Sequence, residues 1–116
     1  MDINKIIKIA AEAGKIILES GGETYRVEET MSRICSAYNI EDSDNYVTPT
    51  VIMISATNGL GQTVSLNKRI TSRTIDLDKI DKVNNLSRSI KENNLTLEEV
   101  ELELNIIKKA SLIIIQ

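Results

Sequence analysis

The chain has 116 residues and a formal net charge of −3, with 41% hydrophobic and 27% charged residues. This length and composition predict one folded domain with a single modest core, and they exclude a disordered chain. Aromatic residues are scarce at 3% and the net charge is negative, which together argue against a nucleic-acid-binding protein. Because the chain has no histidine and one cysteine, serine–histidine and cysteine–histidine catalysis and the usual zinc sites are excluded.

The N-terminal residues predict a helix from about Asp2 to Glu19. Small and aliphatic residues recur there at helical spacing, and Asp2 is placed to cap the first turn. We expect this helix to pack on the core, although an amphipathic helix with three lysines is also typical of a membrane surface. Charges alternate with apolar residues from Met1 to Leu18, so a signal peptide is not expected.

Gly21 and Gly22 predict a tight turn after this helix, because glycine enters the left-handed conformation at little cost. A second helix is expected from Thr24 to Tyr38, with Ser20 or Thr24 accepting a hydrogen bond from an amide of its first turn. The glycine pair does not predict a phosphate-binding loop, because neither GxxxxGK[ST] nor GxGxxG occurs in the chain.

The single cysteine, Cys35, lies on the apolar face of the second predicted helix. It cannot form an internal disulfide, which suits a reducing compartment. We expect it to be a small buried hydrophobic side chain and not a nucleophile.

Three segments rich in β-branched residues predict a small antiparallel sheet with one face against the helices: Tyr46–Thr48, Val51–Thr57 and Gln62–Lys68. Asn58–Gly61 contains two glycines and is expected to connect the last two strands. Pro49 cannot donate a backbone hydrogen bond, so it should break the sheet or lie at its edge, beside Thr50. The acidic segment 39–45 is expected to be a solvated loop, since it lacks the central glycine and closing glutamate of a calcium loop.

Two further helices are predicted in the C-terminal part, from Leu77 to Glu92 and from Thr96 towards Lys109. Acidic residues favour the start of the third helix, and Thr96 with Glu99 predicts a capping box for the fourth. Apolar residues of the fourth helix cover more than one face, which indicates burial on two sides or a partner. The chain is therefore expected to be an α+β fold with two N-terminal helices, a small antiparallel sheet and two C-terminal helices.

Charged and polar side chains that could form a site gather on the second helix, after the sheet and on the third helix: Glu23, Arg26, Glu28, Glu29, Arg33, Arg69, Arg73, Asn84, Ser87 and Arg88. Glu29 and Arg33 are four residues apart with the acid first, the favourable order for an ion pair on one helix face. One hypothesis is an internal ion-pair network, in which Arg69 or Arg73 reaches a carboxylate of the second helix. The other is a binding site for a small zwitterion or carboxylate, in which an arginine holds the carboxylate and a glutamate holds the ammonium group.

The neighbouring acidic residues do not predict catalysis. Glu28 and Glu29 are adjacent, so on a helix they point about 100° apart and cannot face each other as a catalytic pair. Asp76 and Asp78 are explained by the start of the third helix. We therefore expect a protein that is not an enzyme, with no cofactor and no metal site.

Three stretches of the chain resemble one known family: SGGETYRVEETMSRI, TPTVIMIS and RITSRTIDLDKIDKVNNLSRSI. They resemble the N-terminal soluble domain of the putative threonine/serine exporter family of bacterial and fungal membrane transporters, over about Gly14 to Leu104. The positions that match the motifs of the family are Gly21, Gly22, Glu23, Tyr25, Arg26, Glu28, Glu29, Pro49, Thr50, Arg69, Arg73, Asn84, Ser87 and Arg88.

The resemblance implies a part of a secondary transporter that exports threonine, serine or related small carboxylates across the cytoplasmic membrane. The chain would be its cytoplasm-facing N-terminal domain and would act in gating, assembly or substrate sensing. Its implied partners are the membrane-embedded part of the transporter, a small amino acid or carboxylate, and further copies of the chain. The polar cluster is expected at Glu23, Arg26, Glu29, Arg69 and Arg73.

Members of the family continue into a bundle of transmembrane helices, and this chain does not. Leu112–Ile115 supply four apolar residues, whereas a membrane-spanning helix needs roughly 20. They predict either a buried or frayed tail or the first turn of a membrane helix, and the resemblance favours a chain cut short there. The alternatives are a freestanding metabolite-binding or regulatory module, an oligomerisation module built on the fourth helix, and a hydrolase.

Overall fold

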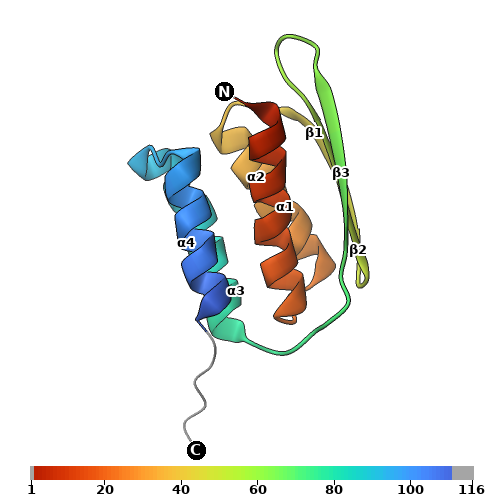
Figure 1. Cartoon of the computed structure of the whole chain (residues 1–116), viewed down its shortest axis with the longest axis vertical. Helices are drawn as coiled ribbons and strands as arrows, with labels where there is room; N and C mark the ends of the chain where they lie inside the picture. The colour runs from red at the N-terminus through yellow and green to blue at the C-terminus, as the bar shows by residue number, and fades with distance from the viewer. Residues whose placement is uncertain (1, 111–116) are drawn as a thin grey trace, which may run out of the picture.

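A computed structural model describes residues 2–110 and confirms the α+β prediction (Figure 1). The described residues form seven elements in the expected order: α1 (Ile3–Glu19), α2 (Thr24–Ala37), β1 (Asp42–Thr48), β2 (Val51–Thr57), β3 (Thr63–Arg69), α3 (Leu77–Asn93) and α4 (Leu97–Lys109). The predicted tail at Leu112–Ile115 lies outside the described residues. Within the described part, none of the helices is both long and apolar enough to cross a bilayer.

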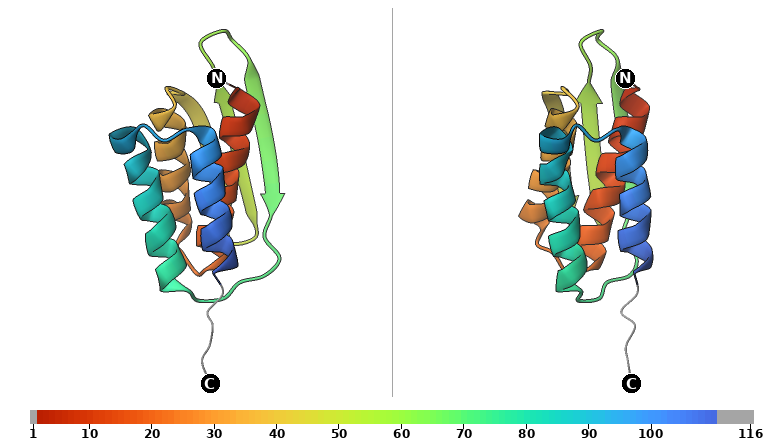
Figure 2. Two further views of the ribbon diagram at one scale, coloured as in Figure 1. Left: turned by 60° about the vertical axis from the view of Figure 1, so that its left-hand side comes forward. Right: turned by 90° about the vertical axis from the view of Figure 1, so that its left-hand side faces the viewer.

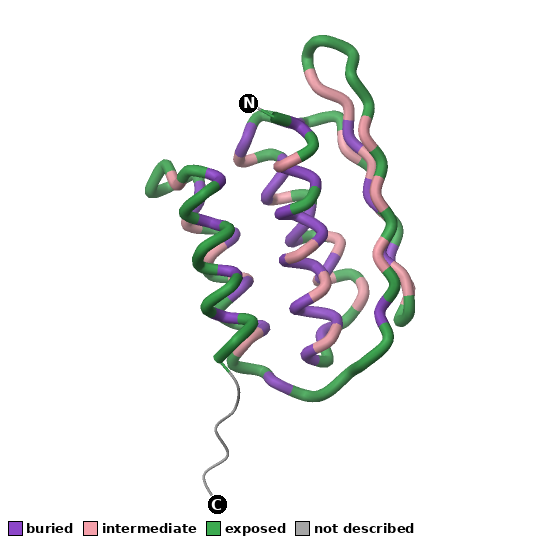
Figure 3. The backbone as a smooth tube through the Cα atoms, viewed as in Figure 1, coloured by how far each residue is buried: buried purple, intermediate pink, exposed green. Residues whose placement is uncertain are grey.

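The elements form three layers, with α1 and α2 between the sheet and the α3–α4 pair (Figures 1 and 2). Both α1 and α2 pack on the sheet on one side and on the C-terminal helices on the other. The apolar residues of α1 are therefore buried on several faces, and this helix is the most deeply buried one in Figure 3. Each fully buried isoleucine, such as Ile6 and Ile17, stabilises the fold by about 1.5–3 kcal/mol. Core packing of the first helix is thus confirmed, and the membrane-surface alternative is wrong.

The three strands are antiparallel and lie in the order β1-β2-β3. Thr48 pairs with Val51, which leaves Pro49 and Thr50 as a two-residue turn at the sheet edge, as the sequence predicts. Alternate residues of β2, such as Ile52 and Ile54, are buried against the helices, while the opposite face of the sheet is open.

The predicted loop at 39–45 is wrong in its second half, because β1 already begins at Asp42. Asp42 and Asp44 point to the open face of the sheet, where their charges stay in water. Asn45 faces the helices instead, and its side-chain amide donates a hydrogen bond of 3.1 Å to the Ser32 hydroxyl. A polar sequence can therefore form this strand, because one of its faces is solvated and the other meets a polar partner.

The turn after α1 is a Schellman motif built on the glycine pair. Gly21 has a φ of +94°, and its N–H donates to the Leu18 carbonyl at 3.1 Å. The N–H of Gly22 donates to the Ile17 carbonyl at 2.9 Å. The predicted role of Ser20 or Thr24 as the cap of α2 is wrong, since Ser20 ends α1 and Glu23 is the residue before α2. The Glu23 side chain makes no capping hydrogen bond. The two glycines delay the start of α2 past Ser20 and leave Thr24 inside its first turn, so neither residue is the N-cap.

Other local predictions are confirmed. Asp2 caps α1 through a 2.9 Å bond from the Asn4 amide, and Thr96 and Glu99 form the reciprocal capping box of α4. Cys35 is buried, and burial raises the pKa of its thiol to about 11, which suppresses thiolate formation.

Candidate functional site

The charged residues expected to form one cluster do not all meet in one place. Glu28, Glu29 and Arg33 line an open hollow of about 710 Å³ along α2, and the others lie elsewhere. At the start of α2, the Arg26 Nε donates to the Glu23 carboxylate at 3.1 Å, and both side chains are exposed. The Arg26 guanidinium carbon also lies 5.9 Å from the centre of the Tyr25 ring. Hydrogen bonds from its own backbone N–H and from Arg26 hold the pKa of Glu23 below its usual value. This pair is a surface feature of one helix and encloses no cavity.

Arg33 joins α2 to α3. Its Nη1 donates to the Asn84 side-chain carbonyl at 3.1 Å and to the Ser87 hydroxyl at 3.0 Å. The predicted pair between Glu29 and Arg33 is wrong, because the ion pairs formed among residues 2–110 do not include it. Neutral acceptors on α3 take the guanidinium instead, while Glu29 stays on the exposed face of α2. Arg33 thus belongs to the packing between two helices.

Glu28 has a different structural role. Its carboxylate accepts a 3.2 Å hydrogen bond from the backbone N–H of Val47 and so connects α2 to β1. Among the strands that the structure describes, β1 is an edge strand that pairs with β2 on one side only, so the Val47 N–H on its other side has no strand partner. The Glu28 carboxylate supplies the acceptor for this N–H. Glu28 therefore stabilises the join between the helices and the sheet.

The expected ion pair from Arg69 or Arg73 to a carboxylate of α2 is also wrong. In the described part of the chain, neither arginine lies within 4.0 Å of a carboxylate, and the same holds for Arg88. The alternation along β3 places Arg69 on the open face of the sheet, away from the helices. Arg73 lies further on, in the segment 70–76 that runs along one end of the molecule to α3 (Figure 1).

The stretches that carry the family resemblance meet at this end through backbone hydrogen bonds. The N–H of Thr74 donates to the Glu19 carbonyl at 2.7 Å, and the N–H of Asp76 donates to the Ser20 carbonyl at 2.9 Å. A Cβ added to Gly21 would lie 3.1 Å from the Thr74 carbonyl oxygen. The Thr50 carbonyl, beside Pro49, accepts from Ile70 at 2.8 Å. The glycine turn, the proline turn and the segment 70–76 are therefore parts of one local structure.

A cavity of about 330 Å³ opens beside these hydrogen bonds, and we call it the corner cavity. It is lined by Ile16, Glu19, Ser20, Ser72, Arg73, Thr74, Lys79 and Lys108. Three of these side chains are cationic, one is a carboxylate, and Ser20, Ser72 and Thr74 add hydroxyl groups. Its volume is at the lower end of the range for small-molecule sites, which suits a ligand the size of a small amino acid.

Two lysines come to the corner cavity from the consecutive helices α3 and α4. Lys79 lies in the first turn of α3, where its N–H donates to the capping Asp76 at 3.1 Å. Its Nζ donates to the Lys108 carbonyl at 3.0 Å, which joins the start of α3 to the end of α4. The Nζ of Lys108 lies 3.4 Å from the Glu12 carboxylate, whose other oxygen lies 3.7 Å from Lys68. The Glu12 pairs connect β3, α1 and α4 next to the cavity.

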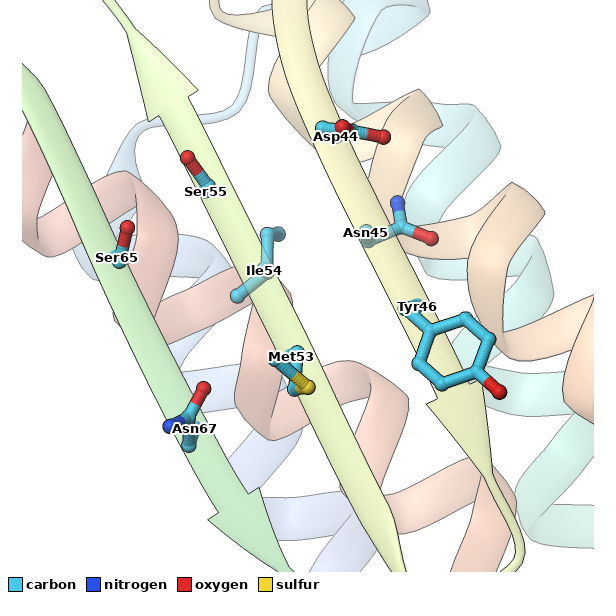
Figure 4. A pocket seen from close by; sticks show the side chains of 8 residues that line it. All are labelled: Asp44, Asn45, Tyr46, Met53, Ile54, Ser55, Ser65 and Asn67. Atoms are coloured by element: carbon cyan, nitrogen blue, oxygen red, sulfur yellow. The ribbon is translucent and has the colours of Figure 1, made fainter.

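A second, smaller hollow of about 190 Å³ lies on the open face of the sheet (Figure 4). Its lining comes from all three strands: Asp44, Asn45, Tyr46, Met53, Ile54, Ser55, Ser65 and Asn67. It contains one carboxylate and no cationic side chain, so it has no charge to balance a ligand carboxylate. The corner cavity is the better candidate for a zwitterion or a carboxylate.

Of the predicted cluster, the corner cavity includes Arg73 alone. Sequence analysis missed Glu19, Ser72, Thr74, Lys79 and Lys108. Ser72 and Thr74 flank Arg73 within one of the stretches that resemble the family. Their position next to Arg73 is the sequence signal that could have identified them. Among residues 2–110, no group of three or more acidic or cysteine side chains is placed to hold a metal ion.

The comparisons with known proteins agree with the resemblance. A family model described as "Putative threonine/serine exporter" matches residues 8–113. No curated protein and no solved structure matches the chain.

Proposed function

Since the chain belongs to the putative threonine/serine exporter family, we propose that its corner cavity recognises the small amino acid or carboxylate that is exported. In this proposal the chain is the cytoplasm-facing N-terminal domain of a secondary transporter in the cytoplasmic membrane. Its partner is the membrane-embedded part, which forms the transport path. The observation that carries the proposal is the combination of Glu19 with three cations around a cavity of suitable size.

The charges of the cavity match both ends of an amino acid. The Arg73 guanidinium presents paired N–H donors to the ligand carboxylate, and Lys79 and Lys108 add positive charge beside it. The Glu19 carboxylate accepts hydrogen bonds from the ligand ammonium group. The hydroxyl groups of Ser72 and Thr74 are partners for a hydroxyl side chain, the feature that serine and threonine share.

Ligand binding would connect parts of the domain that meet at this end. The cavity is formed by the end of α1, the segment 70–76, the start of α3 and the end of α4. A ligand held between Arg73 and Glu19 stabilises the contact of the segment with α1, which the Thr74 and Asp76 backbone bonds already form. This gives a physical route for substrate sensing and gating, because Lys108, near the end of α4, lines the cavity.

Thermal unfolding with a panel of ligands tests the proposal. Threonine, serine and small dicarboxylates are each added to the wild type, to Arg73→Gln and to the control Arg69→Gln. A ligand at 100 times its dissociation constant adds about 2.7 kcal/mol to the free energy of unfolding. We expect stabilisation of the wild type and of Arg69→Gln, and none of Arg73→Gln. Stabilisation that persists in Arg73→Gln, or its absence in every protein, contradicts the proposal.

A Glu19→Gln variant separates amino acids from plain carboxylates. Loss of the carboxylate removes the partner of the ammonium group and leaves the three cations in place. Binding of threonine and serine should weaken, whereas binding of a dicarboxylate should be unchanged or tighter. Equal weakening of both ligand classes would show that Glu19 acts on the structure of the cavity and not on the ammonium group.

The alternatives make different predictions. A freestanding metabolite-binding module would bind its ligand in the same way but would not associate with a membrane-embedded partner. In a chain without histidine, a hydrolase is expected to use a pair of facing carboxylates or a metal ion, and the corner cavity has the single carboxylate of Glu19. The family match favours transport over both.

A further inference from the structure

Helix α4 exposes a narrow apolar stripe on the side away from the core. Leu102 and Ile106 are 61% and 54% exposed, although both are large aliphatic residues. The opposite face of the helix packs on the core through Leu97, Val100, Leu104 and Ile107. Burial of α4 on two sides, one of the two expectations for this helix, is therefore wrong within the described residues, where its second apolar face is exposed (Figure 3).

Charged residues extend this stripe at both ends. Glu99, Leu102, Ile106 and Lys109 follow one another at spacings of three, four and three, so they lie along one face of the helix. The acidic residue is at the N-terminal end and the basic residue at the C-terminal end. We call these four residues the α4 stripe; all four are exposed.

We propose that a second copy of the chain covers the α4 stripe, with the two α4 helices packed antiparallel about a two-fold axis. In this arrangement Leu102 packs on Ile106 of the partner subunit, and Glu99 lies opposite Lys109 of the partner subunit. Each contact occurs twice because the interface is isologous. The antiparallel order also places the helix dipoles in the favourable orientation.

The charges favour an antiparallel second copy over a parallel copy or a membrane surface. A parallel pair would place Glu99 beside Glu99 of the partner subunit, and like charges disfavour that arrangement. Glu98 and Glu101 pair with Lys5 of the same chain, and Glu103 is exposed beside the stripe, which disfavours an anionic membrane surface. A second antiparallel copy pairs the apolar residues with each other and places opposite charges at both ends of the stripe.

A groove next to the stripe enlarges the contact. A hollow of about 490 Å³ runs between α3 and α4 and is lined by Lys82, Asn85, Leu86, Ser89, Glu103, Ile106, Ile107 and Ala110. The partner's stripe lies along the rim of this groove, so α3 adds surface to the helix pair. Specific interfaces commonly bury about 800 Å² per partner, and one helix pair alone contributes only part of that area. The groove also lies apart from the corner cavity, with no shared lining residue, so this inference stands independently of the proposed ligand.

Sedimentation velocity of the full chain over a range of concentrations tests the dimer. We expect the wild type to be a dimer at the higher concentrations, and Ile106→Glu to weaken dimerisation at least about tenfold, because it introduces an unpaired charge into the interface. The matched control is Leu60→Glu, which places the same charge on a residue that is 88% exposed in the β2–β3 loop. That control should dimerise as the wild type does.

A charge exchange tests the register. Lys109→Glu places an acid opposite Glu99 of the partner subunit and should weaken the dimer, and adding Glu99→Lys in the same chain should restore it. Circular dichroism confirms that each variant is folded, which is needed because Glu99 also belongs to the capping box. A wild type that stays monomeric overturns the proposal. So does a dimer that Ile106→Glu and Lys109→Glu leave unchanged.

Discussion

The glycine turn offers a sharp test of how the segment 70–76 is held. Gly21→Ala keeps the chain length and charge but adds one methyl group at a φ of +94°. The left-handed conformation costs a non-glycine residue about 1–2 kcal/mol. The new Cβ would also lie 3.1 Å from the Thr74 carbonyl oxygen, so the segment has to move. Losing one backbone hydrogen bond there adds about 0.5–1.5 kcal/mol.

The expected loss is therefore about 1.5–3.5 kcal/mol, which corresponds to a fall in Tm of about 6–14 °C for a domain of this size. Two other glycines supply matched controls. Gly61 has a φ of +83° but no neighbour within 4 Å, so Gly61→Ala should cost only the conformational part, about 1–2 kcal/mol. Gly59 has neither feature, and Gly59→Ala should be neutral or stabilising by about 0.4–1 kcal/mol.

Urea denaturation followed by circular dichroism measures all three free energies of unfolding. The reasoning requires the order Gly21→Ala, then Gly61→Ala, then Gly59→Ala, from most to least destabilised. If Gly21→Ala and Gly61→Ala lose the same amount, the contact with Thr74 contributes nothing. A Gly21→Ala protein as stable as the wild type would refute the left-handed turn itself.

Three further predictions concern single side chains. Thr96→Ala removes half of the capping box of α4 and should cost about 1 kcal/mol in urea denaturation, whereas an unchanged midpoint would show that Glu99 alone is sufficient. Tyr38→Phe removes the 2.9 Å hydrogen bond from the Tyr38 hydroxyl to the Leu95 carbonyl and should cost about 0.5–1.5 kcal/mol, and a more stable variant would contradict this. Because burial raises the pKa of Cys35 to about 11, the folded protein keeps a proton that the unfolded chain loses above about pH 8.5. The free energy of unfolding should therefore fall as the pH rises from 8.5 towards 11, and Cys35→Ala should reduce this slope; an equal slope in both proteins would contradict it.

Local signals in the sequence predicted most of the fold. The helix bounds of α1 and α4 follow from hydrophobic periodicity and from caps such as Asp2 and Thr96, which act within a few residues. The start of β1 was missed because its first residues alternate between acidic and small polar side chains. Such a strand is stable only where α2 covers one face, and this contact depends on the tertiary structure.

The side-chain partners were less accessible to sequence analysis. The hydrogen-bond acceptors of Arg33 lie 51 and 54 residues away on α3. Sequence spacing instead favours an ion pair between Arg33 and Glu29, which is four residues away on the same helix. Nothing local indicates that α3 supplies the better geometry. Lys79 and Lys108 likewise reach one cavity because the start of α3 and the end of α4 lie at the same end of the molecule. The short connection between these helices indicates that they are antiparallel, but the position of α1 and of the segment 70–76 at the same end depends on how the layers pack.

The most direct test of the central claim is a titration of the isotope-labelled domain with L-threonine, followed by amide NMR shifts. If the corner cavity binds threonine, residues 19–21, residues 72–79 and the end of α4 show saturable shifts, and Arg73→Gln abolishes them. Shifts confined to the open face of the sheet, around Tyr46 and Met53, would place the ligand in the hollow on that face. Those shifts, or a spectrum that threonine leaves unchanged, would contradict recognition by the corner cavity.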